Sequence, residues 1–125
     1  MQTPGPTPAR PPARPPVVVV TLPAEIDMAN QPGVADDLLA AVASGAAVVI
    51  ADMTATTFTD TTGIRALVLA HKQAMASGTE FRVATASRSI LRVMSILGLG
   101  SYLTVYPSVQ EAQAGRPATG EPAAR

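Results

Sequence analysis

Cysteine is absent from the 125 residues, and histidine occurs once, as His71. Disulfide bonds, thiolate nucleophiles and cysteine-ligated metal sites are therefore excluded, and a histidine-rich metal site cannot form within one chain. His71 falls in the middle of an expected helix, so we interpret it as a packing residue at the edge of the core rather than a catalytic base. We expect no catalytic residues, no metal and no cofactor.

Aromatic residues are scarce, with two Phe, two Tyr and no Trp. So few rings argue against a base-stacking surface for single-stranded nucleic acid. Nine Lys and Arg balance nine Asp and Glu, so the chain as a whole has no net positive charge that would attract polyanions such as nucleic acids. Between residues 17 and 115, five basic and eight acidic residues give a net charge of −3, and both ends are basic. We expect no direct binding of nucleic acid.

Long apolar runs are missing as well. The longest nearly apolar stretch, residues 38–51, is interrupted by Ser44 and Gly45. It is shorter than the roughly 20 residues that a membrane-spanning helix needs. No cationic start followed by an apolar run appears at the N-terminus, so no signal peptide is expected. These features predict a soluble, cytoplasmic protein without membrane insertion, and they leave the oligomeric state open.

Proline, by contrast, is abundant, and its distribution divides the chain. Residues 1–16 consist largely of Pro, Ala, Arg and Thr. Such a segment buries too little apolar area to offset the entropy lost on ordering. We predict a disordered proline-rich tail over 1–16, one domain over 17–115, and a second disordered tail over 116–125.

Within residues 17–115, apolar runs alternate with helical periodicity. The runs predict strands at 17–22, 46–51, 80–85 and 102–106. Spacing and capping residues predict four helices, which begin near Asn30, Asp60, Ser87 and Ser108. The segment 52–60 is expected to be a polar connection. This alternation predicts an α/β fold with a mainly parallel sheet.

Amphipathic spacing also predicts which side chains of each helix face the sheet. In the first helix these are Val34, Leu38, Ala41 and Val42. In the second they are Ile64, Leu67, Val68, His71 and Met75. In the third they are Ile90, Val93, Met94 and Leu97.

The segment most suggestive of function is Phe58–Ile64, which follows a predicted strand and opens the second helix. Parallel sheets place functional sites at the carboxyl ends of their strands, and a helix N-terminus suits a phosphate. Thr61 or Thr62 would offer a hydroxyl there, and Gly63 would let a partner approach the backbone. The structural alternative is that Asp60 or Thr59 caps the helix and the two threonines are ordinary first-turn residues.

Two motifs, in the same order along the chain, resemble those of a known protein family. Residues 22–27 read Leu-Pro-Ala-Glu-Ile-Asp, and about thirty residues later 58–64 read Phe-Thr-Asp-Thr-Thr-Gly-Ile. They resemble the Leu-x-Gly-Glu-Leu-Asp and Phe-x-Asp-Ser-Ser-Gly-Leu motifs of STAS domains in anti-sigma factor antagonists. Residues 87–99 are similar to the third helix of that family, so the resemblance covers 17–115.

The resemblance implies a fold, a function and a site. The fold would be STAS-like, with a four- to five-stranded mostly parallel sheet and about four helices. The function would be that of a non-enzymatic anti-sigma factor antagonist, which binds an anti-sigma factor with kinase activity and thereby releases a sigma factor. The residue after the Asp, here Thr61, would be phosphorylated by that partner, with Thr62 the less favoured position. Asp27 and Asp60 would be the flanking acids.

Departures from the family keep a second interpretation open. Thr replaces Ser at both hydroxyl positions, Ala24 replaces Gly, and the proline-rich segment stands where the family has its first edge strand. The alternative is a scaffold or transporter-associated STAS subunit, of a stress-signalling complex or of phospholipid transport, which docks partners without phosphorylation. In either case the expected partner-binding residues are Asp27, Asp60, Thr61, Thr62, Gly63, Arg88, Leu91 and Arg92. Leu91 and Ile96, off the core-facing stripe, would add an apolar docking face.

Overall fold

The computed structural model describes residues 16–115. The two predicted tails, 1–16 and 116–125, lie outside this part of the chain except for Pro16. The prediction that they are disordered therefore stays a prediction.

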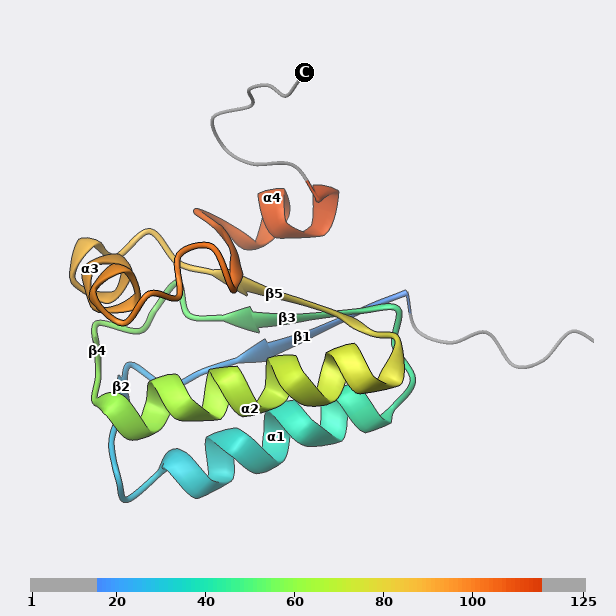
Figure 1. The fold of residues 1–125 in the computed structure, drawn as a ribbon, viewed down its shortest axis with the longest axis horizontal. Helices are drawn as coiled ribbons and strands as arrows, with labels where there is room; N and C mark the ends of the chain where they lie inside the picture. The colour runs from blue at the N-terminus through green and yellow to red at the C-terminus, as the bar shows by residue number, and fades with distance from the viewer. Residues whose placement is uncertain (1–15, 116–125) are drawn as a thin grey trace, which may run out of the picture.

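Four parallel strands form the central sheet, in the order β1-β3-β5-β6. Their bounds are Val17–Thr21 for β1, Val48–Asp52 for β3, Glu80–Ala84 for β5 and Thr104–Tyr106 for β6. Helices α1 (Gln31–Ala43) and α2 (Thr61–Ser77) lie side by side on one face of the sheet (Figure 1). The short helix α4 (Val109–Ala114) covers the other face, and α3 (Arg88–Ile96) lies at the end towards which the strands point (Figure 1). The predicted α/β architecture is confirmed.

The packing of α1 and α2 follows the predicted periodicity with one error. All four predicted core residues of α1 are buried. In α2, Met75 was expected inside but is 61% exposed, whereas Ala66, Ala70 and Ala74 are buried. Small alanine side chains let two helices approach closely. The buried stripe of α2 is therefore rotated towards its alanines, and Met75 lies on the outside.

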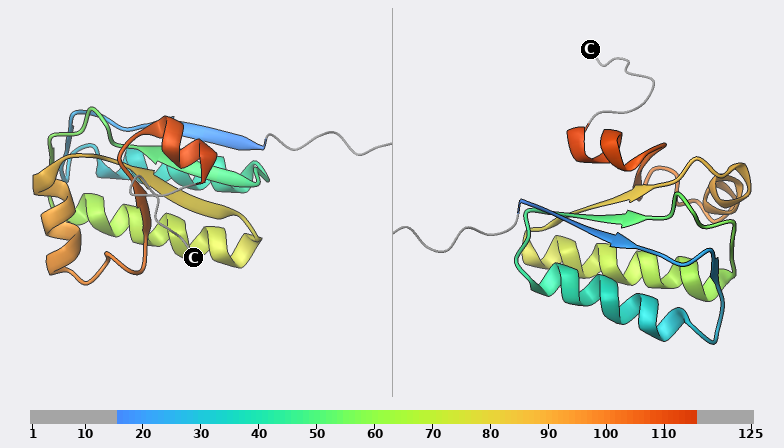
Figure 2. Two further views of the ribbon diagram at one scale, coloured as in Figure 1. Left: turned by 90° about the horizontal axis from the view of Figure 1, so that it is seen from above. Right: turned by 180° about the vertical axis from the view of Figure 1, so that it is seen from behind.

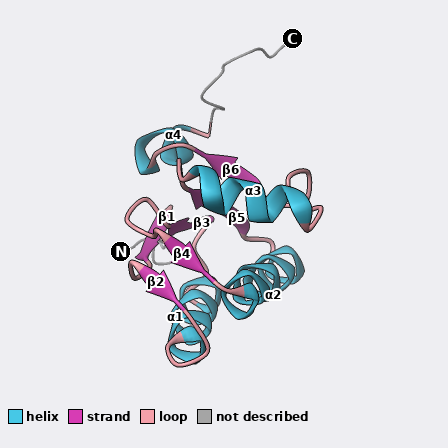
Figure 3. Ribbon diagram, turned by 90° about the vertical axis from the view of Figure 1, so that its left-hand side faces the viewer, coloured by secondary structure: helices cyan, strands magenta, loops and turns pink. Residues whose placement is uncertain are grey.

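A second, very short sheet was not predicted. Strands β2 (Glu25–Ile26) and β4 (Phe58–Thr59) form a parallel pair, in segments that were expected to be connections. Two-residue strands are too short to leave a periodic signal in the sequence. The pair lies at the carboxyl end of the central sheet (Figure 3). Each of its strands lies within one of the two sequence motifs, so the pair aligns Asp27 and Asp60, the residues that directly follow it.

Helix α3 departs from its predicted stripe at its last position. Ile90 and Met94 are buried and Val93 is partly buried, as expected, but Leu97 is 47% exposed. The helix ends at Ile96, and Gly98 turns the chain with a φ of 75°. This turn removes Leu97 from the buried face, so its assignment to the core was wrong.

The single histidine packs against two aromatic rings. The ring of His71 lies edge-on to Tyr102, with centroids 4.6 Å apart, and 6.2 Å from Phe81. Its Nδ1 is buried and has no hydrogen-bond partner within residues 16–115. The surroundings of His71 are therefore those of a packing residue.

Candidate functional site

The centre of the site is the first turn of α2, where Asp60 caps the helix. One oxygen of its carboxylate, Oδ1, accepts hydrogen bonds from the backbone N–H groups of Thr62 (3.0 Å) and Gly63 (3.2 Å). The same oxygen accepts the hydroxyl of Thr62. The Thr62 hydroxyl above all, with these amides, lowers the pKa of Asp60 below its ordinary value of 3.8. At neutral pH the site therefore contains a fixed negative charge.

The two neighbouring threonines differ in what their hydroxyls do. The Thr62 hydroxyl is partly buried and donates to Asp60. Thr61 is exposed, and its hydroxyl forms no hydrogen bond within residues 16–115. Of the two hydroxyls, only that of Thr61 can meet another molecule without first breaking an internal contact.

The second acid, Asp27, emerges beside the first. Ile26 of β2 pairs with Thr59 of β4, and the N–H of Asp60 donates to the carbonyl of Ile26 at 3.0 Å. Asp27 and Asp60 thus occupy equivalent positions after two paired parallel strands. The exposed carboxylate of Asp27 accepts the backbone N–H groups of Ala29 (2.9 Å) and Asn30 (3.2 Å).

Gly63 holds α2 against the short strand pair. A Cβ atom at this buried position would lie 2.1 Å from the Thr59 Oγ1 atom and 2.7 Å from the Ile26 Cγ2 atom. A side chain at this position would force its neighbours to shift, so glycine allows the close packing of the chain itself. Because the residue is buried, its contribution to a partner site is to position the first turn rather than to present an open surface.

Two exposed apolar side chains adjoin the acids, and neither was among the site residues expected from the sequence. Met28 follows Asp27 directly and is 75% exposed, and Phe58, in β4, is 53% exposed. The sequence offered one signal for Phe58. Successive side chains of a strand point to opposite faces, so Phe58 points away from the face on which Thr59 is buried. Large exposed apolar groups beside a polar site are typical of protein-binding surfaces.

The predicted residues of α3 lie on an element that packs against β4. Arg88 and Arg92 are exposed, and neither forms an ion pair within residues 16–115, where the one ion pair joins Arg82 and Glu80. Leu91 is 39% exposed. Arg88 and Leu91 also line a shallow depression of about 400 Å³ next to Tyr106. Ile96 is 73% exposed, so the proposed apolar docking face on α3 is accessible.

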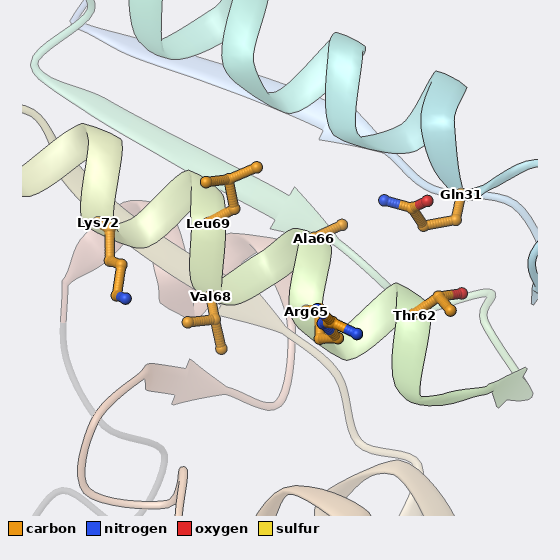
Figure 4. A pocket seen from close by; sticks show the side chains of 7 residues that line it. All are labelled: Gln31, Thr62, Arg65, Ala66, Val68, Leu69 and Lys72. Atoms are coloured by element: carbon orange, nitrogen blue, oxygen red, sulfur yellow. The ribbon is translucent and has the colours of Figure 1, made fainter.

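A shallow groove of about 540 Å³ extends along the outer face of α2 (Figure 4). Thr62 and Gln31 lie at one end of it, and Leu69 and Val68 are among its apolar lining. Two cations, Arg65 and Lys72, also line it, and neither forms an ion pair within the described part of the chain. The cap of α2, Asp60, is thus acidic, and basic side chains follow from about one turn into the helix.

Two other kinds of site find no support in the described residues. Within 16–115, no three His, Asp or Glu side chains are grouped in a way that could hold a metal ion. Over the same range, every helix is too short or too polar to cross a bilayer.

Comparison with known proteins supplies the family. The model of the STAS domain matches residues 9–112. No curated protein matches the sequence. The fold is similar to the crystal structure of an anti-sigma factor antagonist from Mycobacterium paratuberculosis, with a TM-score of 0.74 and 25% sequence identity, covering 80% of this chain and 85% of that chain.

Two further solved structures are similar in fold. The phosphorylated form of the Bacillus cell fate determinant SpoIIAA has a TM-score of 0.62 at 18% identity, covering 83% of this chain and 94% of that chain. A sulfate transporter family protein from Wolinella succinogenes has a TM-score of 0.64 at 22% identity, covering 79% and 83%. At these identities the likeness extends to the fold alone.

Proposed function

Because the chain belongs to the STAS domain family, we propose that it is an anti-sigma factor antagonist whose partner binding is switched by phosphorylation of Thr61. It acts as a binding module rather than an enzyme. The partner is an anti-sigma factor with kinase activity, which supplies both ATP and the catalytic groups. When Thr61 is unmodified, the chain binds this partner and a sigma factor is released.

One observation carries the choice of residue. Thr61 is exposed at the start of α2 with a hydroxyl that is free of internal contacts in the described chain, whereas the Thr62 hydroxyl is bound to Asp60. A kinase transfers the γ-phosphoryl group of ATP to the Thr61 Oγ1 atom, so an O–P bond forms, ADP leaves and the hydroxyl proton is lost. Transfer to Thr62 would first have to break its hydrogen bond to the cap.

The switch follows from charge at this position. A phosphate adds about −1.5 to −2 charges at neutral pH. It would stand beside the ionised Asp60, which already occupies the N–H groups of Thr62 and Gly63. These two N–H groups are therefore not free to stabilise the negative charge of the phosphate. A partner surface that fits a neutral hydroxyl would have to desolvate this added charge, so affinity falls.

The surface that meets the partner combines three parts. The acids Asp27 and Asp60 flank Thr61, Met28 and Phe58 provide exposed apolar area, and α3 contributes a basic edge. That edge consists of Arg88, Leu91 and Arg92. Thr62 and Gly63 fix the geometry of the first turn from within. Such a surface suits a partner with apolar anchors and charges of both signs.

Incubation with ATP and the anti-sigma factor kinase of the same organism tests the modification. Intact-mass spectrometry should record the addition of one phosphate to the wild type and to Thr62→Ala, and none to Thr61→Ala. Thr62→Ala is the matched control because it removes the neighbouring hydroxyl. Phosphate on Thr61→Ala, or its loss only in Thr62→Ala, would reject the assignment of Thr61.

Binding of the same partner tests the switch itself. By calorimetry, Thr61→Glu should weaken affinity at least about tenfold, which corresponds to about 1.4 kcal/mol. Thr61→Ala should keep wild-type affinity, because it introduces no charge. Equal affinity for the Glu and Ala variants would mean that charge at this position does not control docking.

A second candidate, a subunit that docks a partner without phosphorylation, is favoured by the departure from the STAS motif at Thr61 and Thr62, where the family has Ser. The two functions differ in one result. A docking subunit would bind its partner equally well before and after exposure to kinase and ATP, and no phosphate would be found on Thr61.

A further inference from the structure

Helices α1 and α2 lie side by side on one face of the sheet and carry charges of opposite sign (Figure 2). Helix α1 contains two acids, Asp36 and Asp37, and no base. Helix α2 contains two cations, Arg65 and Lys72, and no acid. All four side chains are exposed, and none forms an ion pair within the described part of the chain. The outer surface of the helix layer is therefore divided into an acidic half and a basic half.

The outward ridges of the two helices also differ in size. Residues three or four apart share one face of a helix. Long side chains form the exposed ridge of α2: Arg65, Leu69 and Lys72. Small residues and one acid form the exposed ridge of α1: Gly33, Asp36, Ala40 and Ala43. Leu69 is 48% exposed, so the basic ridge also presents apolar area. A high ridge and a low ridge can interdigitate when two helices pack together.

We propose that a second copy of the chain docks on this helix face, with α1 of each copy against α2 of the other, to form a symmetric dimer. The twofold axis runs parallel to the helices, so each acidic helix meets a basic one on both sides of the axis. The interface uses the same surface on both copies and therefore closes at two subunits. It uses neither Thr61 nor the acids beside it, so the proposal does not rest on the proposed function.

The positions of the charges along the helices agree with this arrangement. Both helices connect parallel strands of one sheet, so they run in the same direction. Gln31 and Thr62 lie at the same end of the groove on α2 (Figure 4). Arg65 and Lys72 lie about 4.5 Å and about 15 Å beyond Thr62 along the helix axis. Asp36 lies about 7.5 Å beyond Gln31 on the same basis. The axis of the dimer preserves these levels, so Asp36 of one copy lies between the two cations of the other.

A second copy fits this face better than the ends of the same chain. Residues 1–15 and 116–125 together contain four arginines and one glutamate. Such segments match the acids of α1 but are repelled by the cations of α2. A second copy brings a basic helix to the acidic half and an acidic helix to the basic half. Charge complementarity over both halves therefore selects the second copy as the occupant.

Sedimentation velocity of the full chain, up to about 200 µM because small interfaces associate weakly, tests the proposal. The wild type should form a concentration-dependent dimer that weakens with added salt, because salt screens exposed charges. Two double variants, Asp36→Lys with Asp37→Lys and Arg65→Glu with Lys72→Glu, should each lose the dimer. Each places like charges opposite one another on both sides of the twofold axis.

The sharpest measurement is an equimolar mixture of the two double variants. The first variant has only bases on its helix face, and the second has only acids. The mixture should therefore recover the dimer that neither variant forms alone, which misfolded variants could not do. A mixture that stays monomeric would overturn the proposal.

Two controls accompany these variants. Far-UV circular dichroism should be the same for both double variants as for the wild type. Gln110→Lys with Gln113→Lys, two exposed changes on α4 across the sheet from α1 and α2, should leave the dimer intact. A wild type that stays monomeric over the whole concentration range would overturn the proposal. A dimer that persists in both double variants would equally reject α1 and α2 as the interface.

Discussion

Two helices begin at the same end of the sheet, and their first turns are built differently. At α2 the cap is the carboxylate of Asp60, which accepts two backbone N–H groups and the Thr62 hydroxyl. At α3 the cap is the neutral Ser87, whose hydroxyl accepts one N–H group, from Ile90 at 3.4 Å. The cap of α2 is thus charged and firmly held, and that of α3 is neutral and more loosely held.

Under the proposed function, the difference separates two tasks within one surface. A hydroxyl that is to be modified needs a fixed position, which the cap at Asp60 and the tight packing of Gly63 provide. A basic, partly apolar edge such as that of α3 needs less precision, because long arginine side chains adapt to the surface they meet. The asymmetry also gives the surface two signs of charge, which sets the orientation of a bound partner.

The strongest test of this contrast is Gly63→Ala. Its Cβ would meet the Thr59 Oγ1 atom at 2.1 Å and the Ile26 Cγ2 atom at 2.7 Å, so the packing between α2 and the short strand pair must rearrange. We expect a loss of about 2 to 3 kcal/mol in the free energy of unfolding, measured by urea denaturation. Gly33→Ala in α1 is the matched control, since nothing lies within 4 Å of its Cβ, and a gain of about 0.5 kcal/mol is expected. Equal effects would mean that the first turn of α2 is not packed tightly.

Removal of each cap compares the two helices directly. Ser87→Ala should lower the free energy of unfolding by about 0.5 to 1 kcal/mol, as is usual for a serine cap. Asp60→Ala should lower it by more, because the carboxylate holds a hydroxyl and two amides rather than one amide. Both are measured under the same urea conditions. A smaller loss for Asp60→Ala would contradict the ranking of the two caps.

The charge on Asp60 predicts a pH dependence that α3 lacks. The folded state lowers the pKa of Asp60 below 3.8, chiefly through the Thr62 hydroxyl, so the unfolded state takes up a proton first. Its contribution to stability is complete above pH 3.8 and is lost as the pH falls through the lowered pKa. The stability difference between wild type and Asp60→Asn should shrink over that acid range. The difference between wild type and Ser87→Ala should stay constant.

Much of this architecture could be predicted from the sequence, because runs of valine and isoleucine and the stripe of α1 leave strong periodic signals. The two-residue strands β2 and β4 could not, since their pairing depends on residues more than thirty positions apart. The motifs placed Asp27, Asp60 and Thr61 together at one end of the sheet. They ranked Thr61 above Thr62 by position in the motif alone, and they could not show that the Thr62 hydroxyl donates to Asp60, because that is a matter of side-chain geometry. Nor did they indicate that the space beside Gly63 is already filled.

The smallest expected effect concerns Arg65, which lies one helical turn after Thr61 on the exposed surface and forms no ion pair within residues 16–115. A phosphate on Thr61 would come within reach of this guanidinium, because residues four apart share a helix face. The pair would stabilise the phosphorylated form by about 0.5 kcal/mol, partly offsetting the repulsion from Asp60.

Arg65→Gln should therefore lower the melting temperature of the phosphorylated protein by about 2 to 4 °C and leave the unmodified protein unchanged. Lys72→Gln is the control, because Lys72 lies about three turns along α2 and cannot reach the phosphate. An equal shift in both forms would mean that Arg65 acts by packing in the groove. The first turn of α2 would then carry the added charge without help from its own helix, and the contrast with the basic start of α3 would be sharper still.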